Sequence, residues 1–198
     1  YAAPPDAVEL NWQLNRPVGD NETGFRGTND TPYRTEAWDF ILAGGALFNH
    51  LDYSFAVGHE DGTYVYPAKQ PGGGNPTLRR QFRILRDFIH DFDFVRMQPD
   101  NSVIKGGAPT GGTARALVEP GKAYAIYVRR TAAGSKLPAE ASAATALQIA
   151  LPEGRWRAEW IDTLTGEVAA RTEFEGSGVH ALNAPGFTDD IALRILRR

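Results

Sequence analysis

The stretch RPVGDNETGFRG, Arg16 to Gly27, decides how the rest of the chain is interpreted. Its first six residues, Arg16 to Asn21, predict a short buried strand, and Glu22 follows at the tip of that strand. A glycine-bearing loop, Thr23 to Thr31, comes next. In a barrel of alternating strands and helices, the carboxyl ends of the parallel strands carry the reacting groups. The position of Glu22 therefore makes it a candidate catalytic residue, with an ordinary loop acid as the alternative.

Length and composition describe a chain that can bury a core. The chain has 198 residues, of which 42% are hydrophobic and 23% are charged, and its net charge is −3. This charge gives no electrostatic argument for a nucleic-acid partner or an anionic membrane. The absence of cysteine excludes disulfides, thiolate metal sites and cysteine nucleophiles. No apolar run approaches the roughly 20 residues of a membrane helix, and we expect no cofactor.

Two patterns divide the chain near the turn-forming residues Gln98 to Asn101. Before this point helical and strand patterns alternate, which is typical of an α/β unit with parallel strands. After it the pattern is strand and turn only, which indicates an antiparallel β-sandwich. We therefore predict an α/β domain over residues 1–98 and an all-β domain over residues 99–198.

The α/β half is expected to contain three helices and two strands. Proline and asparagine or threonine mark the helix starts, and Gly44-Gly45 marks one helix end. The helices are expected over residues 4–14, 31–43 and 75–92. The second strand is expected over Ala46 to Phe55, with enough apolar and aromatic residues to be buried on both faces. A loop of about 20 residues, Ala56 to Asn75, then carries GHEDG and PGGG, and loops of that length are often functional.

The all-β half is expected to contain eight short strands. They are predicted at Ser102–Lys105, Ala114–Val118, Ala123–Arg130, Ala146–Leu151, Arg155–Asp162, Glu167–Phe174, Val179–Leu182 and Asp190–Leu196. An Ala- and Ser-rich excursion, Thr131 to Thr145, separates two of them. We expect Trp156 and Trp160 in the sandwich core, and Trp12 and Trp38 between helices and barrel.

Several stretches resemble one group of bacterial proteins. NETGFRG (21–27), EAWDFILAGGALFNHLDYSF (36–55), GHEDG (58–62) and LRRQFRILRDFIHDFDFVRMQPD (78–100) resemble glycoside-hydrolase-like barrels of the type that includes apiosidases. ARALVEPGKAYAIYV (114–128), LPEGRWRAEWIDTLTGEV (151–168) and DIALRI (190–195) resemble the C-terminal β-sandwich of those proteins, which is named for collagen binding. The resemblance covers nearly the whole chain. It implies the C-terminal portion of a (β/α)8 TIM barrel, strands seven and eight with their helices, followed by the sandwich.

The resemblance also implies a chemistry, that of retaining glycoside hydrolases with two glutamates. Glu22 matches the nucleophile at the end of strand seven. The acid/base glutamate at the end of strand four would lie in a part of the barrel that this chain does not contain. Retaining hydrolysis needs two carboxyl groups about 5–5.5 Å apart. We therefore expect the chain alone to be inactive on glycosides.

Six further residues are candidates for contact with a carbohydrate substrate. They are Asn21, Arg26, Asp52, Tyr53, His59 and Glu60. Arg26 either holds Glu22 ionised, contacts a sugar hydroxyl or forms an exposed ion pair. The loop containing His59 and Glu60 either lines the barrel mouth or forms a surface turn at Asp61-Gly62. We predict no metal site, because three consecutive residues rarely converge on one ion.

Two other interpretations of the chain stay open. It is either a non-catalytic carbohydrate- or matrix-binding module, or an inactive fragment. An incomplete barrel exposes strand edges and apolar faces, so we expect a complementary barrel fragment or self-association. The chain begins at Tyr1 rather than Met. We expect a preceding leader or longer N-terminal region and a secreted or periplasmic bacterial protein.

Overall fold

The computed structural model describes residues 5–130 and 145–198. The chain divides into two compact units, one up to Arg86 and one from Asp87 onward. The first unit contains α1 (Pro5–Asn11), the 3-10 helix η1 (Trp12–Leu14), β1 (Gly19–Thr23), α2 (Asp30–Leu42) and β2 (Leu47–His50), and α3 (Pro76–His90) crosses the division. The domain boundary at residue 98 stays a prediction. Within the described ranges, no helix is both long enough and apolar enough to span a membrane.

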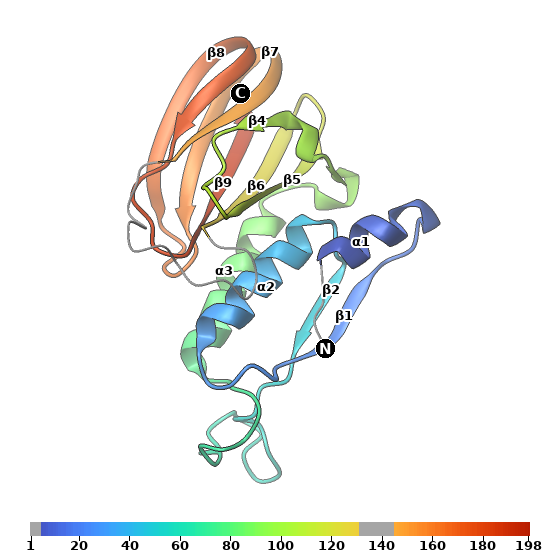
Figure 1. Ribbon diagram of the computed structural model, residues 1–198, viewed down its shortest axis with the longest axis vertical. Helices are drawn as coiled ribbons and strands as arrows, with labels where there is room; N and C mark the ends of the chain where they lie inside the picture. The colour runs from blue at the N-terminus through green and yellow to red at the C-terminus, as the bar shows by residue number, and fades with distance from the viewer. Residues whose placement is uncertain (1–4, 131–144) are drawn as a thin grey trace. The chain divides into compact units, whose positions relative to one another are not determined.

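The strands β1 and β2 lie side by side and run parallel (Figure 1). Asp20 pairs with Phe48 and Thr23 pairs with His50, so β1 has one extra residue between these two pairs. Asn21 and Glu22 therefore stand together opposite the single residue Asn49. Such a β-bulge interrupts the alternation of a strand and redirects its side chains.

Helices cover one face of this two-stranded sheet. The Phe48 ring lies 6.3 Å from Phe40 of α2 and 5.8 Å from Phe82 of α3, measured between ring centroids. The His50 ring lies 4.5 Å from Tyr33 of α2. Leu47, whose side chain points to the other face, is 53% exposed. The prediction of a long strand buried on both faces is therefore wrong, because β2 is only four residues long and Leu47 and Asn49 on its second face are exposed.

The helix starts show how well local sequence signals work. The Asn29 side chain accepts a hydrogen bond from the Thr31 backbone N–H at 3.0 Å, so α2 begins at Asp30, slightly before the predicted start. The Asn75 side chain accepts one from the Leu78 N–H at 2.9 Å and caps α3 as predicted.

Trp38 is buried as predicted, but Trp12 is 40% exposed. The prediction for Trp12 fails because the α-helix gives way to η1 after Asn11.

The second unit contains one curled antiparallel sheet. Its strands are β3 (Gln98–Pro99), β4 (Ile104–Gly106), β5 (Thr113–Glu119), β6 (Ala123–Arg129), β7 (Ala146–Asp162), β8 (Val168–Asn183) and β9 (Asp190–Arg197). The order is β3-β5-β6-β9-β7-β4, with β8 on the other edge of β7. The two-sheet sandwich is not confirmed. The predicted excursion at Thr131 to Thr145 lies outside the described residues except for Thr145.

The curl of the sheet follows from an irregularity in β7. Four predicted strands merge into the long β7–β8 hairpin (Figure 1). The register of this hairpin shifts between Leu151 and Gly154. The bend allows both halves of β7 to contribute to one core. Leu147 comes from the first half, and Trp156 and Trp160 come from the second. Both tryptophans are buried, as predicted.

The buried carboxylate of Glu159 on β7 forms an ion pair with Arg194 on β9. Glu159 is 1% exposed, and its Oε2 accepts hydrogen bonds from the Arg194 guanidinium at 2.9 and 2.7 Å. Its Oε1 lies 2.8 Å from Nε of Arg171, and Arg157 adds a longer contact at 3.6 Å. Arg194 also pairs with Asp91. Burial raises the pKa of Glu159, but the hydrogen bonds from Arg194 and the neighbouring positive charges outweigh it and lower that pKa.

We predict that Glu159→Gln lowers the free energy of unfolding by about 3 kcal/mol, because it removes the buried carboxylate that accepts two hydrogen bonds from the Arg194 guanidinium. The matched control is Glu175→Gln. Glu175 pairs with Arg155 at 3.0 Å in a pair whose side chains are 65% and 75% exposed, so its loss should cost less than about 0.5 kcal/mol. Urea unfolding of both variants measures the difference, and equal losses would contradict the assignment.

Candidate functional site

Glu22 lies in the bulge of β1, at the carboxyl end of the strand. Nδ2 of Asn49 donates a hydrogen bond to the carbonyl oxygen of Asn21 at 2.9 Å and so secures the bulge from β2. Asn21 and Glu22 are both exposed, whereas Asp20 and Thr23 on either side of them are buried. In the part of the chain that the structure describes, no side-chain hydrogen bond or ion pair engages the Glu22 carboxylate. The strand thus presents a carboxylate that is available to a ligand.

Asp20 occupies the buried side of the same strand. Burial raises the pKa of its carboxyl group, while the hydrogen bond from the Glu22 backbone N–H and the nearby Arg26 charge oppose that rise. The carboxyl group of Asp20 therefore contacts the backbone of the bulge. Sequence reasoning did not select Asp20, because β1 reads GDNET and nothing in so polar a stretch marks which of its side chains is buried.

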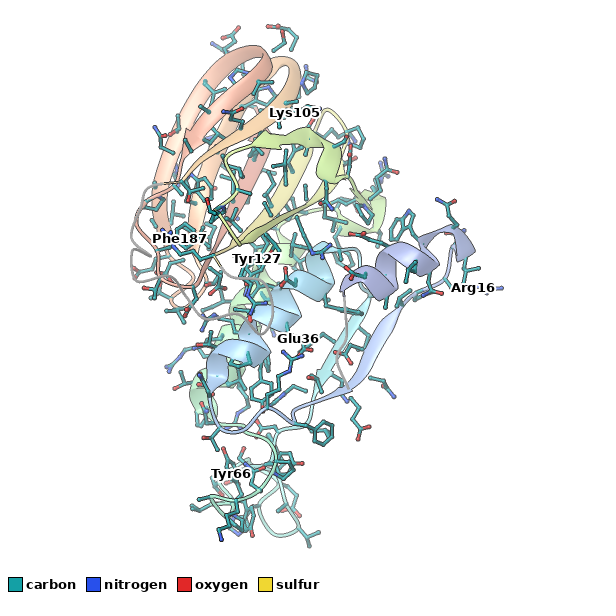
Figure 2. The ribbon with its side chains drawn as sticks, in the orientation of Figure 1. Arg16, Glu36, Tyr66, Lys105, Tyr127 and Phe187 are labelled. Atoms are coloured by element: carbon teal, nitrogen blue, oxygen red, sulfur yellow. The ribbon has the colours of Figure 1, made fainter. Side chains whose placement is uncertain are left out.

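Glu36 of α2 fixes the chain that follows Glu22. Its Oε2 accepts a hydrogen bond from Oγ1 of Thr23, and its Oε1 accepts one from Nη2 of Arg26, each at 2.9 Å. Figure 2 labels Glu36 on the helix. Glu36 is 6% exposed. Arg26 therefore pairs with Glu36 rather than with Glu22, so the expectation that Arg26 holds Glu22 ionised is not what the structure shows.

The Tyr33 hydroxyl completes this support for the loop. It accepts a hydrogen bond from the Arg26 backbone N–H at 2.7 Å and donates one to the carbonyl oxygen of Gly27 at 2.6 Å. The Gly27 N–H in turn donates to the carbonyl oxygen of Pro71 at 2.8 Å. The loop after β1 is therefore joined to α2 and to the PGGG run by hydrogen bonds.

The three glycines of PGGG, at the end of the loop after β2, are buried against the loop after β1 and against the start of their own loop. A methyl group at Gly72 would clash with the carbonyl oxygen of Gly24 and with the Tyr53 ring, and one at Gly74 would clash with the Asp52 carboxylate. Gly73 also accepts a hydrogen bond on its carbonyl oxygen from the Tyr53 N–H at 3.3 Å. Glycine is needed here because backbone approaches backbone. The run thus brings the loops after β1 and β2 together.

Asp52 is held in a polar cluster at the start of the loop after β2. Its Oδ2 pairs with Nη1 of Arg79 at 2.7 Å, and its Oδ1 accepts a hydrogen bond from the Ser54 N–H at 2.9 Å. Burial raises the pKa of Asp52, but the hydrogen bonds from Ser54 and Arg79 outweigh burial and lower it. The role of Asp52 as a sugar contact stays a prediction.

The lowered pKa of Asp52 predicts a dependence of stability on pH. A carboxyl group with a lower pKa in the folded state stabilises that state above its unfolded pKa of about 3.9. This stabilisation is lost as the pH falls through the folded pKa. Asp52→Asn should therefore cost about 1–2 kcal/mol at pH 7 and less at about pH 2, where the pH has fallen toward the lowered folded pKa.

Urea unfolding at the two pH values checks this prediction. The control is Asp93→Asn, because Asp93 forms an exposed pair with Arg96 in which the side chains are 53% and 65% exposed. That control should change stability little at either pH. A cost for Asp52→Asn that is the same at both pH values would contradict an ionic origin.

The remaining predicted contacts lie in the loop after β2. The Tyr53 ring packs edge-on against Tyr66, which Figure 2 labels, at 6.3 Å between ring centroids. His59 contacts Oγ1 of Thr63 through Nδ1 at 3.2 Å, and the Glu60 carboxylate accepts a hydrogen bond from the Gly58 N–H at 3.0 Å. The described residues contain no group of three or more His, Asp or Glu side chains that would hold a metal ion.

The structure brings some of the predicted residues together and leaves others apart. Asn21 and Glu22 are adjacent on the exposed face, and the glycine run ties the base of the second loop, with Asp52 and Tyr53, to the first. The contacts of His59 and Glu60 described above stay within their own loop. The roles of all these residues as catalytic or binding groups stay predictions.

Comparison with solved structures places this architecture among glycoside hydrolases. One structure, described as a glycoside hydrolase, matches 98% of this chain and 45% of its own length, with a TM-score of 0.70 and 17% identity. A glycoside hydrolase family 5 from Bacteroides vulgatus matches 98% of this chain and 44% of its own, with a TM-score of 0.70 and 16% identity. A GH30 endoxylanase from Clostridium papyrosolvens matches all of this chain and 47% of its own, with a TM-score of 0.55 and 9% identity.

The chain has a glycoside-hydrolase-like fold. It spans less than half the length of these structures. At such low identities the likeness establishes the fold and not the chemistry. No protein-family model matches the sequence, and no curated protein matches it.

Proposed function

We propose that this chain is the C-terminal part of a retaining glycoside hydrolase, with β1 and β2 as strands seven and eight of a TIM barrel. In this proposal Glu22 is the nucleophile, and the acid/base carboxylate lies outside the chain. One observation carries the proposal. The β1 bulge places Glu22 at the carboxyl end of a parallel strand, exposed and without a side-chain partner among the described residues, in a glycoside-hydrolase-like fold.

The proposed reaction has two steps. An oxygen of Glu22 attacks the anomeric carbon and forms a glycosyl ester while the bond from that carbon to the leaving oxygen breaks. The second carboxyl group gives its proton to the leaving oxygen. Water then attacks the anomeric carbon, loses its proton to the second carboxylate and releases Glu22. Because this second group is required, the chain alone is expected to be inactive.

Substitution of Glu22 tests the proposal in the intact barrel protein that carries this chain. Glu22→Gln should reduce hydrolysis of aryl glycosides at least about 10³-fold, because the amide is a poor nucleophile. A 2-deoxy-2-fluoro glycoside should label Glu22 in the unsubstituted protein. The control is Glu167→Gln, an exposed acid of the second unit, which should keep full activity. Normal turnover by Glu22→Gln would disprove the assignment.

Asn49 is proposed as the positioning residue for Glu22. Its amide holds the carbonyl oxygen of Asn21 across the bulge, so Asn49→Ala should let Glu22 move from its productive position. We expect kcat to fall about tenfold or more with KM nearly unchanged, because small displacements of reacting groups are costly. Steady-state kinetics check this split. A change confined to KM would contradict positioning and indicate a substrate contact.

The open sheet supports the proposed partner. Within the described residues, β1 and β2 form a two-stranded sheet, so each strand has an outer edge without a paired strand. Such edges favour pairing with further strands. We propose that a complementary barrel segment or a second copy covers them, with carbohydrate as substrate. Export from a bacterial cell remains part of this proposal.

A further inference from the structure

The loop after β2 carries an aromatic ring that the catalytic proposal does not use. We propose that Phe55 is a stacking platform for a sugar ring of a neutral polysaccharide, with Asp61 beside it as a hydrogen-bond acceptor. The class of ligand rests on the proposed function. The position of the platform rests on the contacts of Phe55 itself.

The Phe55 ring is supported from within the protein and is still 47% exposed. The Arg79 guanidinium carbon lies 5.1 Å from the ring centroid, in cation–π contact. The backbone at Gly62 lies against the ring edge, because a Cβ built there would be 2.9 Å from Cζ of Phe55. Gly62 has φ +74°, which favours glycine. These contacts fix the orientation of a ring that remains open to solvent.

Hydrogen bonds also hold the Arg79 side chain that contacts the ring. Nη1 of Arg79 donates to Oδ2 of Asp52 at 2.7 Å and to Oγ of Ser54 at 2.8 Å. The Phe55 N–H donates to the carbonyl oxygen of Asp52 at 3.2 Å. The cluster around Arg79 therefore holds both the backbone and the ring of Phe55. A preorganised ring loses little conformational freedom when a ligand stacks on it.

A carboxylate lies next to the glycine that contacts the ring. Asp61 precedes Gly62, and its Oδ1 accepts hydrogen bonds from the Thr63 hydroxyl at 2.7 Å and the Thr63 N–H at 3.2 Å. The hydrogen bonds from Thr63 lower the pKa of Asp61. The group therefore stays ionised at neutral pH and keeps further capacity to accept sugar hydroxyls. The ring and an acceptor on the residue before Gly62 together match the two kinds of surface on a pyranose, its C–H face and its hydroxyl groups.

The position of the loop suits an extended ligand. Because β1 and β2 are parallel, the loop after β2 and the tip of β1 lie at the same end of the sheet (Figure 1). A polysaccharide reaching Glu22 can thus extend over this loop, whereas an aryl monosaccharide need not. Pyranoses whose hydroxyl groups are all equatorial offer an open C–H face for stacking, so we take xylan and β-glucan chains as the ligand class to test.

Affinity electrophoresis of this chain in gels containing soluble xylan or mixed-linkage β-glucan tests the platform without turnover. Phe55→Ala should bind about fivefold more weakly, because the stacking contact is lost. Phe55→Trp should bind at least as well as the unsubstituted chain, and its indole fluorescence should change on adding the polysaccharide. The control is Val65→Ala, which removes an apolar side chain of the same loop that is 89% exposed and should leave binding unchanged.

Three outcomes would overturn the platform. They are retention of Phe55→Ala equal to that of the unsubstituted chain, an equal loss in Val65→Ala, and no retardation of the unsubstituted chain in either gel. If Phe55→Ala is poorly folded by circular dichroism, the fluorescence of Phe55→Trp decides the question. The platform and the nucleophile fail separately, because Glu22→Gln is scored by turnover and Phe55 by binding.

Discussion

A buried carboxylate on α2, that of Glu36, holds the chain segment that follows the strand tip. An ionised carboxylate can stay buried only when charged or polar hydrogen bonds replace its hydration. Thr23 and Arg26 supply these hydrogen bonds from either side of the first turn after β1. The hydrogen bonds that the buried Glu36 carboxylate requires therefore fix the position of the turn after β1 relative to α2. These bonds anchor the backbone next to Glu22, whose side chain makes no hydrogen bond or ion pair among the described residues.

The glycine run extends this constraint from one loop to the next. Gly72 and Gly74 let the chain pass where any side chain would clash with Gly24 or Asp52. The loop after β2 is long, but it is anchored at its base by backbone contacts and by the ion pair of Asp52 with Arg79. Exposed residues further along the loop thus stand on a fixed base. A long surface loop does not have to be flexible when its own backbone is packed in this way.

Local signals in the sequence predicted the helices and most strand positions, and the glycoside-hydrolase-like fold was expected from resemblance. Asn75 caps α3 and Trp38 is buried, as the local sequence around each residue predicts. Contacts between distant segments were not predictable. Glu36 is one of several charged residues in α2, and nothing in its spacing reveals Thr23 as a partner. Pro152-Glu153-Gly154 has the composition of a turn, yet the ladder resumes at Gly154 opposite Gly176, so two expected strands are one.

The bulge in β1 has a further consequence for what a strand tip can offer. Neighbouring side chains of a regular strand point to opposite faces. Between two inward residues such as Asp20 and Thr23, the bulge accommodates both Asn21 and Glu22 on the outward side, where a regular ladder would leave room for one. Deletion of Asn21 or Glu22 would restore a regular ladder between β1 and β2 and leave only one of these two side chains on the exposed face. One additional residue in the strand thus lets its end present two polar side chains on the exposed face instead of one, without lengthening any loop.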